Sequence, residues 1–426
     1  MRSLAGAVIL SLLAGPVAAQ HLRDRVRELF AFGTCGRQLC LDGSVTAANG
    51  HGDHFLPELI AGNSSLIGFV SDAVGSAAAS APLSATGSGV TYRFVGGLPV
   101  KVTESSGPIL AERAQTLGKG RFFLGANLTS ASFKRIRGVP LDGLEFNFAH
   151  QDVGAAGLGD PPLENDILEV RMQLNLKMQV TTLFATVGVT DGIDFSIAVP
   201  VVHTSLQGRS QAQIYPFGST ALHFFNGTTA APGLRASTAT FGSATGLGDV
   251  AVRVKANLRS EESFAVALLG DARLPTGDER DLLGAGSASF RGLGIISARI
   301  GDFRPHLNVG GLIRGGAGNT DAVAMTVGFE QPMATWATVV VDLLGEWQLG
   351  DGGRRLPEPT VYQFPFLRTV QPTNIPTTGD DRLAGSVGFK FRMNRGPTFV
   401  TNALVPLGRG GLQPTVTLTA GLEYGF

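Results

Sequence analysis

The last segment of the chain alternates between apolar residues and polar or small residues. Apolar side chains occupy every second position from Val416 to Phe426, and threonine, glycine or glutamate lies between them. Successive side chains of a β-strand point to opposite faces, so this period of two predicts a strand with one apolar and one polar face. The same alternation recurs in four earlier segments: 168–180, 250–259, 339–348 and 387–393.

Counting such segments back from the C-terminus predicts about fourteen strands, with twelve as the alternative because the two segments nearest the N-terminus alternate least clearly. The predicted strands cover 90–102, 121–131, 137–148, 167–190, 193–206, 248–259, 263–274, 287–300, 303–314, 321–331, 335–348, 382–393, 397–405 and 414–426. Within 167–190 the apolar phase flips near Thr181 and Thr182, which indicates either a bulge or an unseen turn.

Short and long connections alternate along this series of predicted strands. The tight connections fall at 191–192, 260–262, 301–302, 331–333 and 395–396. The longer ones cover 149–166, 207–247, 275–286 and 349–381, and only the link at 316–320 breaks the rhythm by being short. Barrels of the outer membrane have short periplasmic turns and longer external loops. Because unpaired backbone groups are costly in hydrocarbon, the strands should close on themselves, so 90–426 is predicted to form an all-β, antiparallel transmembrane β-barrel.

Composition agrees with a surface that faces lipid. Charged residues make up 16% of the chain, against about 25% in an average soluble protein. Lysine and arginine together number 34, as do aspartate and glutamate, so nothing favours nucleic acid as a partner. Beyond the N-terminal segment, no apolar stretch of roughly 18 residues could form a helical membrane span.

The N-terminal region does not alternate. Residues 1–19 resemble a cleaved signal peptide, with Arg2 before a short apolar run, although a membrane anchor is the alternative. Residues 20–89 are predicted to form a periplasmic segment or a plug inside the barrel, and disorder is the alternative. In an exported protein, Cys35 and Cys40 are expected to form a disulfide, with a metal pair as the rival.

The polar face of the strands should line the lumen. The charged residues predicted to point inward are Arg253, Lys255, Asp271, Arg273, Asp342, Glu346, Lys390 and Arg392. Both signs occur in this set, so the charges can pair across the lumen, and a pore that filters ions by charge is not favoured. Tyr424 and Phe426, at the end of the last strand, are the predicted signal for barrel assembly.

Several glycine-rich stretches resemble the outer-membrane family named for the meta-pathway of phenol degradation. They are Glu112 to Gly120 followed by Arg121-Phe122-Phe123, Gly246-Leu247-Gly248-Asp249, Leu274 to Glu279, and Gly292-Leu293-Gly294. The resemblance runs from about residue 107 to the C-terminus. The sequence departs from the family where Val187-Gly188-Val189 replaces an aromatic-glycine-leucine signal. The resemblance implies a barrel that passes small hydrophobic or aromatic molecules, and it brings no catalytic residues.

Three motifs carry candidate chemistry of other kinds. His51 and His54 flank Asp53 and are conceivable metal ligands, but a solvated loop is favoured because no third partner is evident. His203 with Ser205, and His223 with Ser219, are conceivable hydrolase pairs, yet no Gly-x-Ser-x-Gly motif accompanies them. The acidic stretch 274–281 is interpreted as a strand exit and turn rather than a cation site.

Aromatic residues near predicted strand ends suit a girdle at the membrane interface, and some are alternatively placed on a ligand path in the loop 349–381. They are Trp336, Trp347, Tyr362, Phe364, Phe366, Tyr424 and Phe426. The sequence therefore predicts a channel or transporter in the cell outer membrane for a small hydrophobic or aromatic solute. It predicts no enzymatic activity, cofactor or metal, and the expected partners are outer-membrane lipid and the barrel-assembly machinery. The alternatives are a structural or adhesive surface barrel and a membrane-embedded hydrolase.

Overall fold

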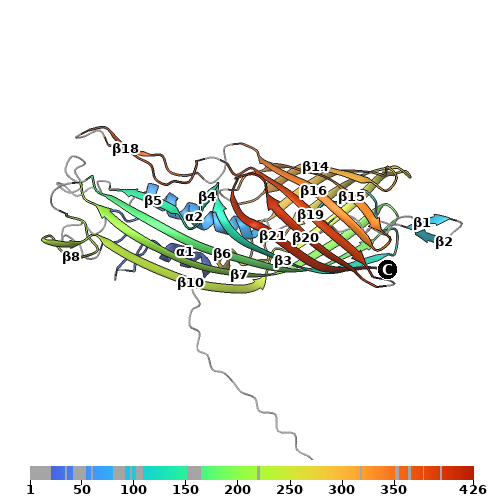
Figure 1. Ribbon diagram of the computed structural model, residues 1–426, viewed down its shortest axis with the longest axis horizontal. Coiled ribbons are helices and arrows are strands. Elements are labelled where there is room, and N and C mark those ends of the chain that lie inside the picture. The colour runs from blue at the N-terminus through green and yellow to red at the C-terminus, as the bar shows by residue number, and fades with distance from the viewer. Residues whose placement is uncertain are drawn as a thin grey trace, which may run out of the picture.

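The architecture is that of a computed structural model of the chain (Figure 1). The described residues are 21–33, 36–41, 54–58, 61–79, 92–95, 98–101, 109–150, 165–217, 221–316, 319–350, 355–362, 366–377, 379–393 and 396–426. The predicted signal peptide, residues 1–19, lies outside them. Among the helices of the described residues, none has both the length and the apolar character needed to cross a membrane.

Twelve antiparallel strands close into a barrel in which every strand pairs with its neighbours along the chain. They are β3 (Phe122–Ile136), β6 (Ile167–Gly188), β7 (Ile193–Tyr215), β11 (Ala251–Ser260), β12 (Phe264–Arg273), β13 (Ser289–Ala298), β14 (Arg304–Arg314), β15 (Ala322–Ala334), β16 (Ala337–Gln348), β19 (Arg382–Arg392), β20 (Thr398–Pro406) and β21 (Leu412–Gly425). The last strand pairs with the first, from Leu412 opposite Ile136 to Gly425 opposite Phe123. This pairing leaves no open edge where the barrel closes.

The structure confirms the antiparallel barrel and corrects the count of fourteen strands to the alternative of twelve. Within the segment 90–102, β1 (Tyr92–Val95) and β2 (Leu98–Lys101) instead pair with each other in a separate sheet. The segment 137–148 contains β4 (Val139–Pro140) and β5 (Leu144–Ala149). Strand β5 pairs with the far part of β6, from Leu144 opposite Met172, and forms an isolated bridge from Phe146 to Thr373, so it is not one of the twelve strands of the closed barrel.

The two ends of the barrel differ as the rhythm of connections predicts. The five connections after β6, β11, β13, β15 and β19 are short and lie at one end, called here the turn end, where Phe122 pairs with Phe426. The other end, the loop end, carries the long connections. The predicted loop 207–247 is wrong in part, because β7 continues to Tyr215 and pairs with β10 (Arg235–Leu247). Two further hairpins extend this end: β8 (Asn226–Thr228) with β9 (Ala231–Gly233), and β17 (Thr360–Tyr362) with β18 (Arg368–Val370).

Strands β6 and β7 are about twice as long as a membrane-spanning strand needs to be, at 22 and 23 residues against about 9–11. In Figure 1 they run from the barrel far beyond its loop end. The phase flip near Thr181 is neither a bulge nor a turn, because pairing with β7 is continuous from Ile167 to Gly188. The strand instead passes from one environment to another.

On the turn side of Thr181, outward side chains are apolar, as at Leu183 and Val187, and inward ones include Thr182 and Thr186. On the loop side the polarity reverses. Outward positions are polar, and the inward positions are the apolar residues Leu168, Val170, Met172, Leu174, Leu176, Met178 and Val180. The prediction that this second set faces lipid is therefore wrong.

The neighbouring strands change polarity at the same height. Thr181 pairs with Val201 of β7, and Gln179 pairs with His203. On β10, Leu247 and Thr245 face the same two residues of β7. Below this level the outward residues are apolar, and above it nearly all are polar. We take this level as the membrane boundary, because a lipid-facing surface must be apolar and a solvent-facing one need not be.

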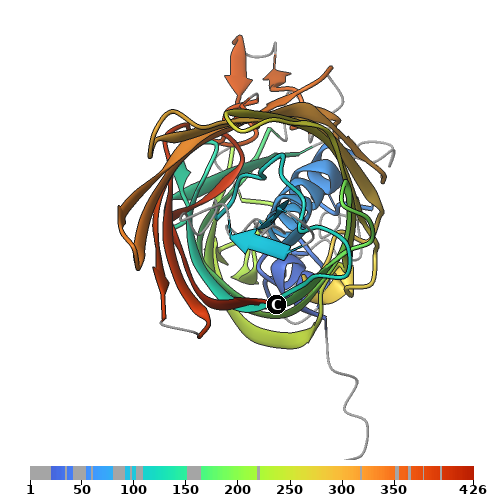
Figure 2. The ribbon, with the colours of Figure 1, turned by 90° about the vertical axis from the view of Figure 1, so that its right-hand side faces the viewer.

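The inner face of the extension packs against the N-terminal segment. Helix α1 (Leu22–Glu28) contacts β7 and β10, and helix α2 (Ala61–Ala79) contacts β5 and β21. Figure 2, which looks along the barrel from the turn end, shows both helices inside the ring of strands. Phe30, which follows α1, stacks edge-on against Phe146 and Phe148 of β5 at centroid distances of 5.5 and 5.8 Å. Each large apolar side chain buried here contributes roughly 1.5–3 kcal/mol.

Small residues on the strands make room for α1. A Cβ atom at Gly208 of β7 would lie 2.4 Å from Cδ1 of Leu29, and one at Gly242 of β10 would lie 2.8 Å from Cδ2 of Leu22. A hydrogen bond also holds α1 against β10, because the hydroxyl of Thr240 donates to the carboxylate of Glu28 at 2.7 Å. The inward face of the extension is therefore shaped to hold this helix.

Candidate functional site

An extended segment, residues 109–121, runs through the turn half of the lumen. Its backbone is held by inward side chains of the barrel. Asn308 of β14 accepts from the amide of Glu112 at 2.7 Å and donates to its carbonyl at 2.9 Å. The carboxylate of Asp194 accepts from the amide of Leu117 at 3.0 Å. The Glu112–Gly120 stretch that carries the family resemblance is therefore the part of the chain that the lumen binds.

Glycine is required where this segment meets the wall. The amide of Gly120 donates to the carbonyl of Gly188 at the end of β6, at 2.8 Å. A Cβ atom at Gly188 would lie 1.9 Å from the carbonyl oxygen of Gly118. Any larger residue at Gly188 would push the segment away from the wall.

Charged side chains pair around the lumenal segment. Arg113 forms a two-pronged ion pair with Glu330 of β15, with 2.7 Å between Nε and Oε1. Glu112 accepts from Arg253 at 3.3 Å, and Arg253 also donates to Asp271 at 2.5 Å. These pairs link the lumenal segment to several strands and fill the turn half of the lumen.

Two more buried pairs connect strands of the wall itself. His306 of β14 lies 2.7 Å from Asp342 of β16, measured from Nε2 to Oδ1. Lys390 of β19 donates to Glu423 of β21 at 2.8 Å. All four side chains are buried on the inward face. Pairing and hydrogen bonding are what make buried charges tolerable.

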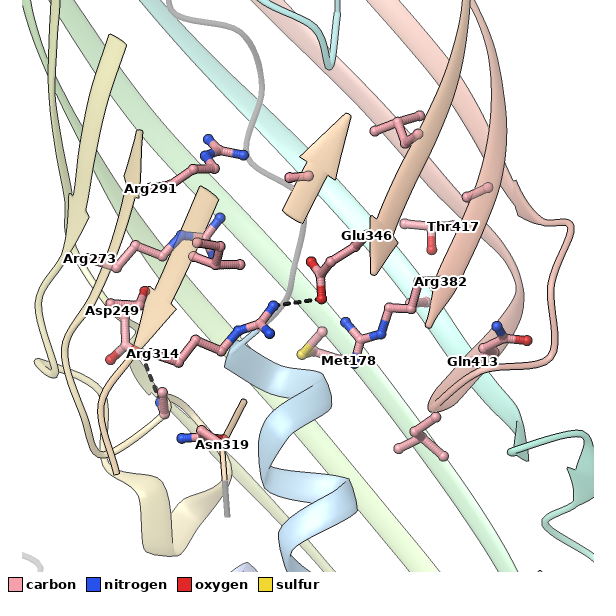
Figure 3. A pocket seen from close by; sticks show the side chains of 18 of the residues that line it. Met178, Asp249, Arg273, Arg291, Arg314, Asn319, Glu346, Arg382, Gln413 and Thr417 are labelled. Carbon is pink, nitrogen blue, oxygen red and sulfur yellow. Dashed lines mark hydrogen bonds and ion pairs between the residues drawn. The ribbon is translucent and has the colours of Figure 1, made fainter. Parts of the chain in front are cut away.

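A cavity of about 450 Å³ lies between α2 and the barrel wall, near the loop end (Figure 3). One side of it carries the guanidinium groups of Arg273, Arg291, Arg314 and Arg382, from β12, β13, β14 and β19. The opposite side is largely apolar, formed by Ala131 and Phe133 of β3 and by Met178 and Val180 of β6. Acidic side chains line the cavity as well, namely Asp72, Asp249, Asp271, Glu279 and Glu346. The cavity is therefore amphipathic, with a charged wall and an apolar one.

The arginines of the charged wall are partly engaged in ion pairs. Arg314 donates to Glu346 at 2.6 Å, the ion pair drawn in Figure 3. Arg291 donates to Asp271 at 2.9 Å. Nε of Arg382 is buried and has no hydrogen-bond partner among the described residues. Arg382 is therefore a cavity-lining arginine whose Nε makes no hydrogen bond to a described residue.

The structure places the charged residues predicted to line the lumen on inward strand positions. Arg253, Lys255, Asp271, Asp342 and Lys390 are buried in the ion pairs of the turn and middle parts. The Lys255 ammonium lies 3.8 Å from Glu112 and 3.7 Å from Asp194. Arg273 and Glu346 line the cavity, and Arg392 lies on the same face of β19 as Lys390, near the turn end.

Sequence reasoning missed several residues that shape this site. Arg113 and Glu330 were not selected, although Arg113 lies within the stretch that resembles the family. Arg291, Arg314 and Arg382 were also missed, although each sits in a predicted strand. The inward parity of their positions was the available signal, since each has the parity of the polar face.

Of the two conceivable hydrolase pairs, the structure describes both members of only the first. His203 and Ser205 lie on the outward face of β7, and Nδ1 of His203 lies 2.7 Å from the hydroxyl of Thr245 on β10. His223 contacts Asp166 and His54, as described below, and Ser219 lies outside the described residues. The absence of catalysis remains a prediction.

The acidic stretch 274–281 forms a capped turn. Asp278 accepts from the amide of Arg280 at 2.9 Å, at the start of a short 3₁₀ helix, η3 (Glu279–Asp281). The hydrogen bond from the Arg280 side chain lowers the pKa of the Asp278 carboxyl. Asp249, in the strand break between β10 and β11, accepts from the amides of Gly277 and Ala285. These carboxylates stabilise the loop conformation.

Other predictions have mixed outcomes. Cys40 is buried, but Cys35 lies outside the described residues, so their pairing stays a prediction. Of the aromatic residues, Tyr362 is buried in β17 beyond the barrel and is not part of a girdle, and Phe364 is outside the described residues. The others are exposed: Trp336, Trp347, Phe366, Tyr424 and Phe426.

The fold defines a transmembrane barrel: a closed up-and-down sheet with an apolar outer band and a polar, charge-paired interior. The model of the family described as "Putative MetA-pathway of phenol degradation" matches residues 168–296, from β6 to β13. The match covers less than half of the chain and includes three of the glycine-rich stretches, Gly246–Asp249, Leu274–Glu279 and Gly292–Gly294, while the stretch Glu112–Phe123 lies outside it. No curated protein matches the sequence.

Solved structures similar to this chain are outer-membrane barrels at low identity. An outer membrane channel from Pseudomonas putida F1 is 10% identical with a TM-score of 0.41, over 74% of this chain and 98% of that one. The P. putida toluene transporter TodX is 9% identical with a TM-score of 0.31, over 72% and 89%. A Pseudomonas aeruginosa FadL homologue is 9% identical with a TM-score of 0.30, over 72% and 89%. At these scores the likenesses carry no argument about the site.

Proposed function

We propose that this protein is an outer-membrane channel or transporter for small hydrophobic or aromatic compounds. The observation that carries the proposal is the amphipathic cavity under α2, with arginines on one side and apolar side chains on the other. The family match and the named channels among the structural neighbours agree with this function.

The cavity has the size and lining of a small-molecule site. Its volume of about 450 Å³ lies within the range of roughly 300–1,000 Å³ typical of such sites. Phe133, Met178 and Val180 would cover the face of an aromatic ring and remove it from water. The Arg382 guanidinium, a planar donor, would bind a hydroxyl or carboxylate on the same solute. A monoaromatic compound with one polar substituent therefore fits both walls.

The N-terminal segment would act as the plug. Residues of α1 and α2 line the cavity, among them Arg23 and Asp72, which form an ion pair with each other. Below the cavity, the lumenal segment 109–121 and its ion pairs narrow the barrel. We propose that passage requires these two elements to shift, because side chains of both lie along the route.

Binding to the purified protein tests the proposal first. Titration calorimetry with benzoate or phenol should show binding, and Arg382→Ala should weaken it about tenfold or more, since a charged hydrogen bond contributes roughly 1.5–3 kcal/mol. Arg171→Ala is the matched control, because Arg171 is exposed on the outer face of β6. Reconstituted liposomes should then swell in the same solute. Protein that neither binds nor admits any aromatic solute would rule the function out.

The cellular placement follows from the same proposal. Cleavage of residues 1–19 would export the chain, and the assembly machinery would recognise the last strand through Tyr424 and Phe426. Both aromatic side chains are exposed on the outer face at the turn end. The turn end would then face the periplasm and the extension would stand outside the cell.

A further inference from the structure

Three histidines from distant parts of the chain meet in the extension beyond the barrel. His54 lies between α1 and α2, His150 follows β5, and His223 lies in the connection between β7 and β10. All three side chains are buried. The chain has 7 histidines in all, so the meeting of three in one buried place calls for a chemical explanation.

Their ring nitrogens converge on one point. Nδ1 of His54 lies 2.5 Å from Nε2 of His150 and 3.2 Å from Nε2 of His223. One nitrogen from each ring falls within 4.8 Å of the other two. A tetrahedral ion held about 2.0–2.1 Å from each nitrogen would set them about 3.3 Å apart. Moving the His150 ring away from His54 by roughly 1 Å would therefore give these two nitrogens the spacing of two ligands of one ion.

An acidic residue orients one of the rings as metal sites require. The carboxylate of Asp166 accepts from Nδ1 of His223 at 2.7 Å, which leaves the lone pair of Nε2 directed at His54. The same carboxylate accepts from the amide of Phe217 at 2.6 Å, so its position is fixed by the backbone. A carboxylate that holds the far nitrogen of a histidine is the usual second layer of a histidine–metal site.

Aromatic side chains pack around the three histidines. Phe55 stacks edge-on against both His150 and His223, at centroid distances of 5.7 and 5.5 Å. Tyr362 donates its hydroxyl to the carbonyl of His150 at 3.2 Å. These contacts hold the rings in the arrangement in which one nitrogen of each lies near the other two, and a metal ion binds imidazole through such a nitrogen.

We propose that His54, His150 and His223 bind a divalent transition-metal ion of the Zn²⁺ class, with Asp166 as the residue that positions His223. Buried imidazole donors suit Zn²⁺ and its neighbours and do not suit Mg²⁺ or Ca²⁺. A bound ion would join the segment between α1 and α2 to the chain after β5 and the chain after β7. It would thereby clamp the N-terminal segment inside the extension.

Metal binding is tested on the full chain, purified with a tag that lacks histidine and stripped with a chelator. Added Zn²⁺ should bind with one ion per chain, measured by elemental analysis after dialysis. Co²⁺ in its place should show the visible absorption of a tetrahedral site. Both signals should vanish in His54→Ala and in His223→Ala. Zn²⁺ should raise the unfolding temperature of the wild type and leave those two variants unchanged.

Two further variants keep the test decisive if an alanine variant misfolds. His203→Ala is the matched control, because His203 lies outside the cluster on the outer face of β7, and it should bind Zn²⁺ as the wild type does. Asp166→Asn should weaken Zn²⁺ affinity by about 10–100-fold while retaining one ion per chain. Wild-type protein that takes up no ion, or affinity unchanged in folded His54→Ala and Asp166→Asn, would overturn the proposal.

Discussion

Lys390 and Glu423 form a buried ion pair across the inner wall, with 2.8 Å between Nζ and Oε2. They lie on β19 and β21, so the pair spans the whole width of β20 between them. Both are inward residues near the turn end, and both are buried. The pair shows how the barrel neutralises its interior.

Breaking this pair should destabilise the barrel. Lys390→Met leaves Glu423 buried without its cation, and we expect the free energy of unfolding to fall by about 3–5 kcal/mol. The double variant Lys390→Met with Glu423→Leu should recover most of that loss, because no buried charge remains. Urea unfolding in lipid vesicles measures both, and Lys177→Met, on the exposed outer face of β6, is the control. A single variant as stable as wild type would show that water solvates Glu423.

A glycine is required beside the second buried pair. A Cβ atom at Gly328 of β15 would lie 2.2 Å from Oδ1 of Asp342 and 2.8 Å from Nε2 of His306. Gly328→Ala should therefore separate the pair and cost about 1–3 kcal/mol. Gly311→Ala on the adjacent β14 is the matched control, because nothing lies within 4 Å of its Cβ position. Equal unfolding free energies for the two variants would contradict the packing described.

The membrane boundary predicts that two outward positions of β7 differ in their tolerance of an introduced charge. Ile197 lies below the boundary, and Gln207 lies above it. Ile197→Arg should cost about 2–4 kcal/mol of folding free energy in vesicles, since the charge would enter hydrocarbon. Gln207→Arg should change it by less than about 0.5 kcal/mol. If Gln207→Arg lowered the folding free energy more than Ile197→Arg, the lipid would surround the opposite end of β7 from the one described.

The Tyr362 hydroxyl should lose its proton only at a pH well above the usual value for tyrosine. Burial raises the pKa of its hydroxyl to about 12, although the charge of Arg368 opposes that effect. The pKa of the Tyr362 hydroxyl in the folded protein lies above the unfolded value of about 10. Its contribution to the free energy of unfolding is therefore fully present below pH 10 and declines as the pH rises towards 12. Tyrosinate absorbance of the wild type minus that of Tyr362→Phe measures the group alone. A midpoint near pH 10 in this difference would mean that the hydroxyl is open to water.

The barrel strands could be predicted from the sequence because lipid and lumen impose alternate positions. Twelve predicted segments coincide with barrel strands to within a few residues, except where β7 runs past its predicted end at 206. The errors at 137–148 and 168–180 share one cause. Leu168 and Leu144 belong to alternating segments, but their apolar faces pack against the N-terminal helices. Alternation indicates that one face of a strand is apolar, but it does not indicate whether lipid or protein covers that face.

The sites depend on contacts that no local pattern carries. His54 meets partners 96 and 169 positions away in the chain, so its neighbours in sequence gave no sign of a third ligand. The charged wall of the cavity contains one arginine from each of four strands. Their common inward parity could be predicted, but their common height depends on the register between strands, which the sequence does not specify.

The most direct test of the account is a spin-label scan along the outer face of β6, in a Cys35→Ser, Cys40→Ser background. Labels at Arg171, Lys177 and Gln179 should collide mainly with a water-soluble nickel reagent, and labels at Leu183 and Val187 mainly with oxygen dissolved in lipid. The change should fall at Thr181, where the outward face turns from polar to apolar. Uniform nickel accessibility along the whole strand would contradict a barrel that leaves the membrane at that level.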